Sequence, residues 1–311
     1  SSLLKKITGC AVTWRTHHFI LECPMKKLRN NFAVSSLLMV SPLAAVLLIF
    51  LVLPIVLIVV VSFWRATEFS IIPAFELDNY EFLFGSPVTY TVFFKTFKYA
   101  LITWFFTVLL GFTIAFYLAF HIRTLTWQIT LFLLCTIPFW TSNIIRMISW
   151  IPFLGRNGIA NSTLISWGVI DEPIEWLLFS DFAVILAFVH LYTLFMVVPI
   201  FNTMMRIDKS LIEAARDAGA NGAQILWNVI IPLTKPGIMI GTIFVVTLVM
   251  GDFITVRFMS GSQSANVGRL ISNDIALLQY PSASATAIVL LLTVLITIGI
   301  LLRFVDIRKE L

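Results

Sequence analysis

Charged residues are rare in the long apolar stretches of this sequence, so those that occur there are the first candidates for chemistry. Asp252 and Arg146 fall inside such stretches, and Arg257 lies near the end of one. A charge at the centre of a membrane-spanning helix costs about 2.5–3.5 kcal/mol on insertion scales, so each should face a protein interior or a partner. Arg257, being near an end, is expected to extend to the membrane surface. A carboxylate at Asp252 could attract the ammonium group of a cationic solute.

Aromatic and amide side chains in the same stretches would suit such a solute, because ring faces attract cations. The candidate substrate path comprises Asp252, Arg146, Trp140, Asn143, Trp150 and Tyr192. Asn143 lies one helical turn from Arg146 and should share its face. A second interpretation stays open, in which Asp252 and Arg146 form a structural pair or a gate between two helices.

Other chemistry finds little support in the sequence. No pair of cysteines has the spacing of metal ligands, and His190 is alone in its apolar stretch. The chain has no GxxxxGK[ST] phosphate loop, so it is not an ATPase and is expected to bind no cofactor itself. An intramembrane aspartyl protease would need Gly-x-Gly-Asp before Asp252, and Val249 takes the place of the first glycine. An intramembrane enzyme is therefore not favoured.

The composition indicates a membrane protein. Hydrophobic residues make up 59% of the 311 residues, charged residues only 12%, and the mean hydropathy is +0.97. A soluble domain of this size could not bury so much apolar surface. A spanning helix needs about 20 apolar residues, and six runs qualify: Leu37–Phe63, Tyr99–Phe120, Ile129–Ile151, Phe182–Met205, Pro236–Met259 and Ala285–Phe304. The predicted fold is an all-α bundle of six transmembrane helices.

Basic residues set the predicted orientation. If the N-terminus is cytoplasmic, the inner segments carry 14 Lys and Arg residues and the outer segments carry 5. Cytoplasmic loops are enriched in Lys and Arg, so both termini are predicted to be cytoplasmic. The net charge of +5 thus reflects membrane topology and does not indicate a nucleic-acid partner.

The segment 207–235 is polar and is predicted to lie on the cytoplasmic side. Ser210 and Glu213 have the S-x-x-E spacing of a capping box, which predicts a helix that begins at Leu211. Gly219 fits the left-handed position that ends such a helix.

A second helix should follow at once. Asn221 and Gln224 repeat the capping pattern, Pro232 should stop this helix after about residue 230, and Thr234 could cap the next one. The resulting hairpin has a slim face, formed by Ala214, Ala215 and Ala218. Apolar anchors for a groove on another protein are Leu211, Ile225, Leu226 and Trp227.

The residues "EAARDAG", followed nine residues later by "VIIP", resemble the EAA loop of permease subunits of ATP-binding-cassette (ABC) importers. In that family the loop docks into the ATPase subunit. The resemblance therefore implies the type I ABC importer permease (MetI-like) fold, with the hairpin as a coupling helix. It also implies ATPase-coupling roles for Glu213, Ala214, Ala215, Gly219, Leu226 and Pro232.

Further stretches are similar to the spermidine/putrescine permeases of the binding-protein-dependent transport family. They are "LDNYEFLF", "IPFWTSNIIRMISW", "GRNGIANSTLISWGVIDEP" and "GDFITVRFMSG". The similarity implies half of a translocation pathway in the bacterial inner membrane for a small cationic solute. It also implies an ABC ATPase dimer that holds ATP and Mg, a second homologous permease, and a periplasmic solute-binding protein.

Alternatives remain for the substrate and for the class of transport protein. "FITV" stands where some polyamine permeases have Phe-Ile-Thr-Pro, so an opine, a quaternary amine or an amino-acid-like solute stays open. A stand-alone secondary transporter or channel would predict inverted repeats, and no duplication is visible. The expected organisation is a cytoplasmic segment 1–36, with an extension before Met25, a permease domain 37–305 and a cytoplasmic tail 306–311.

Overall fold

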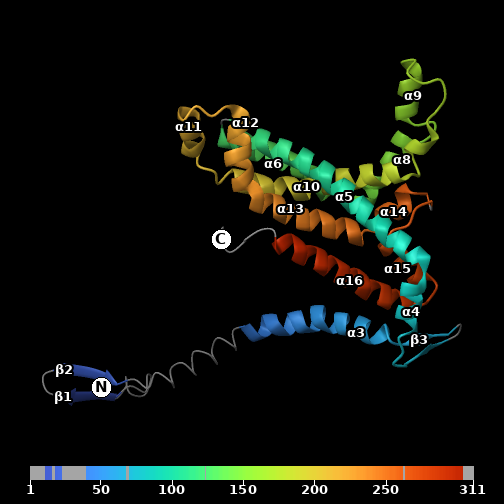
Figure 1. Cartoon of the computed structure of the whole chain (residues 1–311), viewed down its shortest axis with the longest axis horizontal. Coiled ribbons are helices and arrows are strands. Elements are labelled where there is room, and N and C mark those ends of the chain that lie inside the picture. The colour runs from blue at the N-terminus through green and yellow to red at the C-terminus, as the bar shows by residue number, and fades with distance from the viewer. Residues whose placement is uncertain are drawn as a thin grey trace. The chain divides into compact units, whose positions relative to one another are not determined.

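The computed structural model describes residues 11–15, 18–22, 40–67, 70–122, 124–261 and 263–303 (Figure 1). Met25 and the tail 306–311 lie outside the described residues, as does most of the segment 1–36. The chain divides into two compact units, Ser1–Val60 and Val61–Leu311.

The first unit contains a pair of short strands and a long apolar helix. Strands β1 (Ala11–Arg15) and β2 (His18–Glu22) pair antiparallel. The helix runs over Val40–Val61 and includes the π-helical turn η1 (Leu48–Val52) and α3 (Leu53–Val61). Its prolines do not interrupt it, and its length and hydropathy suffice for the first predicted span.

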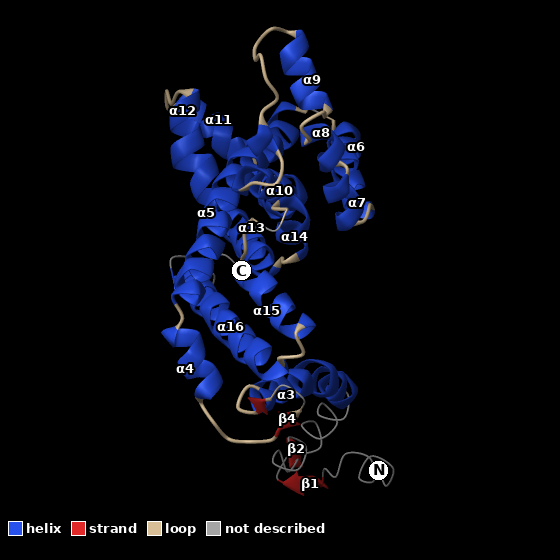
Figure 2. Ribbon diagram, turned by 90° about the vertical axis from the view of Figure 1, so that its right-hand side faces the viewer, coloured by secondary structure: helices blue, strands red, loops and turns tan. Residues whose placement is uncertain are grey.

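The second unit is predominantly helical (Figure 2). It begins with a short antiparallel pair, β3 (Arg65–Ala66) and β4 (Ile71–Ile72). Its helices up to the middle of the chain are α4 (Asp78–Gly85), α5 (Pro87–Phe116), η2 (Tyr117–His121), α6 (Leu125–Thr136), η3 (Ile137–Trp140), α7 (Asn143–Ile148), α8 (Trp150–Leu154) and α9 (Ile159–Ser166). Those that follow are η4 (Glu175–Leu177), α10 (Asp181–Met204), α11 (Lys209–Asp217), α12 (Gly222–Ile225), η5 (Leu226–Ile230), α13 (Ile231–Gly251), α14 (Ile254–Met259), α15 (Val267–Ala276) and α16 (Tyr280–Arg303).

Helices α5, α10 and α13 pack against one another and form the core of this unit. Gly237 and Gly241 of α13 have the GxxxG spacing, which lets two helix backbones approach each other closely. A Cβ atom on Gly237 of α13 would lie 2.5 Å from the Pro199 carbonyl oxygen of α10, and one on Gly241 would lie 3.2 Å from the Met196 Cα. These two helices are therefore in backbone contact along one side of α13.

The third predicted span is not one straight helix. Residues Leu125–Trp140 and Asn143–Ser166 form two arms that meet at 89°. Pro138 lacks a backbone N–H, and the 3₁₀ turn around it ends at Thr141, whose hydroxyl donates to the Pro138 carbonyl at 2.7 Å. The described residues thus contain five helices long and apolar enough to span, or six if this bent pair is one span.

The fifth predicted span is longer than expected at its beginning, and Pro232 does not stop the preceding helix. Residues Gly222–Gly251 form one helix of 30 residues. The π-helical turn η5 shifts the hydrogen bonding, with the Ile231 amide bonding to the Leu226 carbonyl, so that Pro232 falls in the first turn of α13. Thr234 caps no new helix, because its hydroxyl donates to the Ile230 carbonyl at 2.8 Å.

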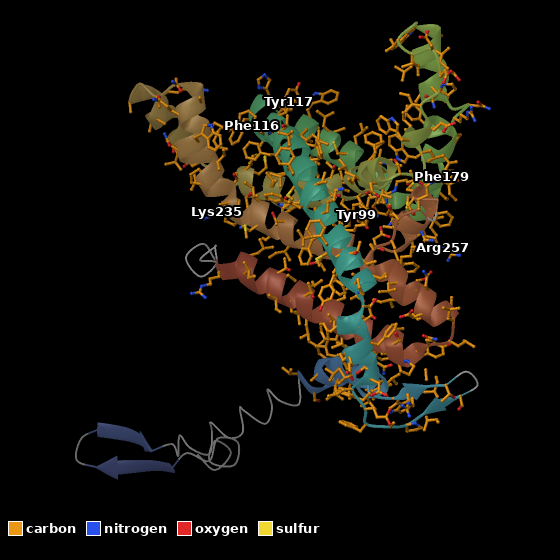
Figure 3. All side chains as sticks on the ribbon, turned by 45° about the vertical axis from the view of Figure 1, so that its right-hand side comes forward. Tyr99, Phe116, Tyr117, Phe179, Lys235 and Arg257 are labelled. Carbon is orange, nitrogen blue, oxygen red and sulfur yellow. The ribbon has the colours of Figure 1, made fainter. Side chains whose placement is uncertain are left out.

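The two ends of this unit differ. The hairpin α11–α12 lies at one end, while α8, α9 and α14 lie at the other (Figure 1). Lys235 and Arg257 lie toward these opposite ends (Figure 3). Helices α10 and α13 run between these two ends. They therefore connect the hairpin to the region around Asp252.

Candidate functional site

Asp252 lies at a break in the helix and not at its centre. Helix α13 ends at Gly251 and α14 begins at Ile254. The Asp252 Oδ1 accepts from the Thr255 backbone N–H at 2.9 Å, and Oδ2 accepts from the Thr255 hydroxyl at 2.5 Å. Tyr192 of α10 donates its hydroxyl to the same Oδ2 at 2.6 Å. The carboxylate is thus fixed between α10 and the start of α14.

One acceptor position of the carboxylate has no hydrogen-bond donor among the described residues. A carboxylate has about four acceptor positions, and the contacts above use two on Oδ2 and one on Oδ1. Asp252 borders a pocket of about 360 Å³. The pocket is lined by Asn143, Met147, Tyr192, Thr247, Leu248, Gly251, Asp252 and Ile254.

Arg146 does not neutralise Asp252. Among the described residues, no Arg146–Asp252 ion pair forms within 4.0 Å. Arg146 instead donates to the Asn143 side chain, and its buried Nε has no hydrogen-bond partner among the described residues. In the described structure Asp252 is bonded to Tyr192 and Thr255, and Arg146 to Asn143, so the two charged groups do not pair with each other.

The expected aromatic residues are not all brought together. Tyr192 and Asn143 line the pocket with Asp252. Trp150 donates its Nε1–H to the His190 Nδ1 at 2.9 Å, so His190 has a partner. Trp140 is 85% exposed and does not line this pocket. Of the three expected aromatic residues, only Tyr192 therefore lines the Asp252 pocket.

Sequence reasoning missed several polar partners around Asp252. Thr255 follows Asp252 by three residues, a spacing typical of a side chain that caps a helix start, so "DFIT" carried a usable signal. Asn266 is fully buried and donates to the Asp252 carbonyl at 2.7 Å. No local pattern indicates Asn266, because a loop brings it back from 14 residues away.

A second polar cluster was also missed. Asp181, at the start of α10, accepts from the hydroxyls of Tyr99 at 2.6 Å and Ser264 at 2.5 Å. Lys98 lies 3.8 Å from its other carboxylate oxygen. Tyr99, midway along α5 (Figure 3), is 1% exposed, so this cluster ties α5, α10 and the loop after α14 together.

The hairpin is present, with a different first cap. Helix α11 begins at Lys209, because the Asp208 side chain accepts from the Ser210 amide at 3.0 Å. The predicted capping box of Ser210 and Glu213 is therefore wrong. The hydrogen bond from Ser210 lowers the pKa of Asp208, since it stabilises the charged form.

The second cap and the turn match the prediction. Asn221 accepts from the Gln224 amide and Gln224 accepts from the Asn221 amide, both at 2.8 Å. Gly219 has φ +83°, the left-handed conformation that side chains with a Cβ rarely adopt.

Part of the expected docking surface is exposed. Glu213 and Ala214 are exposed and Ala215 is half-buried, while Leu226 is half-buried and Pro232 exposed. Trp227 is 68% exposed and Leu211 49% exposed. Ile225 is buried and packs in the core, so it cannot be an anchor for a partner.

The structure of this chain is similar to that of a known transporter subunit. No family model matches the chain. A chain of a bacterial alginate ABC transporter, crystallised with alginate pentasaccharide-bound periplasmic protein, matches with a TM-score of 0.73 at 16% identity. The match covers 93% of this chain and 99% of that one. The fold is therefore that of an ABC transporter permease.

The sequence relatives are permeases too. The spermidine/putrescine transport system permease protein PotB of Escherichia coli (strain K12) is 34% identical over 266 residues, 85% of this chain and 94% of its own. PotB of Salmonella typhimurium (strain LT2) is 33% identical over 258 residues, 82% of this chain and 87% of its own. The chain belongs to the family of spermidine/putrescine transport system permeases. It is a multi-pass inner-membrane protein from a family of transport permeases.

Proposed function

We propose that this chain forms half of the translocation pathway of an ATP-driven polyamine importer, with putrescine or spermidine as its solute. The observation that carries the proposal is the 34% identity to a spermidine/putrescine permease over 85% of the chain. The Asp252 pocket supports it, since a carboxylate with no cation within 4.0 Å among the described residues suits an ammonium ligand.

Asp252 is proposed to bind one ammonium group of the solute. Its remaining acceptor position on Oδ1 can take an N–H donor, while Tyr192 and Thr255 hold the carboxylate still. The Tyr192 ring, which stacks with Phe188 at 5.8 Å, adds a face for a cation. Asn143 lines the same pocket, and its side-chain oxygen accepts a hydrogen bond from Arg146. It is therefore proposed to position the Arg146 side chain and the solute.

The hairpin is proposed to couple the permease to an ABC ATPase dimer, which would bind ATP and Mg. The proposed contact surface consists of the exposed residues Glu213 and Ala214 of α11 and Trp227 of η5. Gly219 and Pro232 would fix the shape of this surface, with Ala215 and Leu226 packed beneath it.

The proposed assembly also contains a second homologous permease and a periplasmic solute-binding protein. The solved neighbour is a transporter in complex with such a protein. The proposed orientation has both termini and the hairpin in the cytoplasm, supported by 14 inner against 5 outer Lys and Arg residues. ATP binding would then move the hairpin and open the pathway outward, an alternating-access cycle.

Competition measurements test the substrate class. Cells that lack other polyamine importers would express the full transporter and take up labelled spermidine or putrescine. Excess unlabelled polyamine should abolish the uptake, whereas an opine, a quaternary amine or an amino acid should not. Uptake of one of those solutes in place of polyamines would overturn the polyamine assignment and keep the importer class.

A further inference from the structure

The backbone on both sides of Asp252 lies against the start of α15. A Cβ atom on Gly268 of α15 would lie 3.2 Å from the Gly251 carbonyl oxygen and 3.3 Å from the Phe253 backbone nitrogen. Gly251 and Phe253 are the chain neighbours of Asp252. The helix break that carries the carboxylate is therefore in close backbone contact with α15.

Asn266 bonds to both sides of this contact. It is fully buried, and its Nδ2–H donates to the Asp252 carbonyl oxygen at 2.7 Å. Its Oδ1 accepts from the Arg269 backbone N–H at 3.0 Å, which caps the start of α15. The carbonyl groups at the end of a helix lack partners within it, and Asp252 directly follows the last residue of α13. One side-chain amide thus satisfies the Asp252 carbonyl and the first turn of α15.

The residues beside Asn266 are bonded to two core helices. The Val267 backbone N–H donates to the Thr96 hydroxyl of α5 at 3.0 Å. The Ser264 hydroxyl donates to Asp181, at the start of α10, at 2.5 Å. Because these two bonds lie on either side of Asn266 in the chain, they fix its position relative to α5 and α10.

We infer that Asn266 is a positioning residue, which holds the Asp252 backbone so that the carboxylate faces the pocket. The inference rests on the proposed function, in which Asp252 binds an ammonium group. Tyr192 and Thr255 hold the carboxylate oxygens, and Asn266 holds the peptide group next to them. A binding group meets its ligand in the required geometry only when the groups behind it are fixed as well. Without the bond from Asn266, the Asp252 carbonyl would be free to turn, and the side chain with it.

Asn266→Ser separates the two hydrogen bonds of this side chain. Serine caps a helix start about as well as asparagine, so α15 should be unchanged. The serine side chain is shorter and has no amide nitrogen to reach the Asp252 carbonyl. Asn221→Ser is the matched control, because Asn221 caps α12 in the same way and belongs to the hairpin at the other end of the unit (Figure 1).

Hydrogen exchange in the purified full transporter measures the two effects separately. The Thr255 backbone N–H donates to the Asp252 Oδ1, so its exchange rate reports how firmly the carboxylate is held. Asn266→Ser should raise that rate about tenfold, the effect of one lost hydrogen bond, while the amides of α15 keep their rates. Asn221→Ser should change neither. Gly268→Ala, whose Cβ atom would press on the Gly251 carbonyl, should also raise the Thr255 rate and provides the test if Asn266→Ser does not assemble.

Uptake by the reconstituted transporter tests whether Asn266 acts through Asp252. With the ATPase, the partner permease and the binding protein present, Asn266→Ser should lower the initial rate of labelled spermidine uptake about tenfold. In an Asp252→Asn background the same exchange should lower the rate no further, because residues that act together give non-additive effects.

Two results would overturn the inference. An unchanged Thr255 amide, with or without faster exchange in α15, would make Asn266 a helix cap only. An equal further loss of uptake in the Asp252→Asn background would show that Asn266 does not act through the carboxylate. Hydrogen exchange needs no solute. If the unmodified transporter took up no spermidine, the proposed solute would be rejected, and the Thr255 exchange rate would still test the role of Asn266.

Discussion

At the scale of single residues, the candidate site depends on how one carboxylate is held. Asp252 has two fixed neighbours, Tyr192 and Thr255, and both donate hydrogen bonds to it. These donors carry no charge of their own, whereas an arginine partner would oppose the carboxylate with a positive one. The arrangement therefore leaves a negative charge available to a cation.

Asp252→Asn is expected to lower uptake of a cationic solute by about ten- to hundredfold, since hydrogen bonds to charged groups contribute about 1.5–3 kcal/mol. The amide has nearly the same shape, so assembly with the ATPase should persist. Labelled-solute uptake and co-purification measure the two effects. Loss of assembly with the Asn variant would instead assign Asp252 a structural role.

Asp274 of α15 predicts a pH dependence of stability. Burial raises its pKa above the ordinary 3.8, against a hydrogen bond from Ser282 that lowers it. Because the folded-state pKa is raised, the contribution to stability is complete below pH 3.8 and is lost as the pH rises through the folded-state pKa. Asp274→Asn should therefore raise the Tm at neutral pH and match the unmodified protein at low pH. A lower Tm for the variant at neutral pH would contradict this reasoning.

Sequence reasoning named Asp252 with two of its pocket neighbours, Tyr192 and Asn143, but did not predict the hydrogen bonds that hold the carboxylate. A lone carboxylate in an apolar stretch is easily found from the sequence, because it is a charged residue among hydrophobic ones. Its partner Tyr192 lies 60 residues away, and no local rule relates the two. The same holds for Asp181 and Ser264, which are 83 residues apart. Pairings of this kind are set by helix packing.

At the scale of elements, the contact of α10 with α13 decides the fold of the second unit. Small residues bring the two backbones together, and α13 continues without a break into the hairpin. This contact therefore holds together two of the three core helices of the unit.

Gly237→Val should destabilise the protein, because its side chain would meet the Pro199 carbonyl and the Ile200 Cα of α10. Overpacking costs about 1–3 kcal/mol, and each kcal/mol lowers the Tm by about 2–4 °C. Gly299→Val is the matched control, since a Cβ atom there meets nothing within 4 Å. Thermal unfolding in detergent should separate the two, and equal Tm values would contradict the close contact.

Gly219→Val should abolish uptake without preventing membrane insertion. Its φ of +83° is strained for valine, although the site has open space around it. Gly219→Asn should retain uptake, because asparagine tolerates the left-handed conformation. If valine and asparagine behave alike, the shape of the turn does not matter for coupling.

Two element boundaries were predicted well, the start capped by Asn221 and the hydropathy edges of α10, whereas the cap predicted at Ser210 was wrong. They were predicted poorly around proline. Pro232 looked like a stop, but the π-helical turn before it rearranges the hydrogen bonds. Pro138 lies in a span that looked continuous by hydropathy and instead ends one arm of an 89° bend. Hydropathy does not report the path of the backbone.

At the scale of the whole molecule, the second unit has the hairpin at one end and α8, α9 and α14 at the other, joined by α10 and α13 (Figure 1). The pathway proposed for the solute passes the Asp252 pocket, which is lined by residues of both helices.

The most direct test is uptake by the reconstituted transporter. Proteoliposomes would contain this chain, its permease partner and the ATPase, with the binding protein outside and ATP and Mg inside. Labelled spermidine or putrescine should accumulate only with ATP and binding protein, and Gly219→Val should abolish accumulation. Accumulation without ATP, or unchanged accumulation with that variant, would contradict a permease driven through its hairpin.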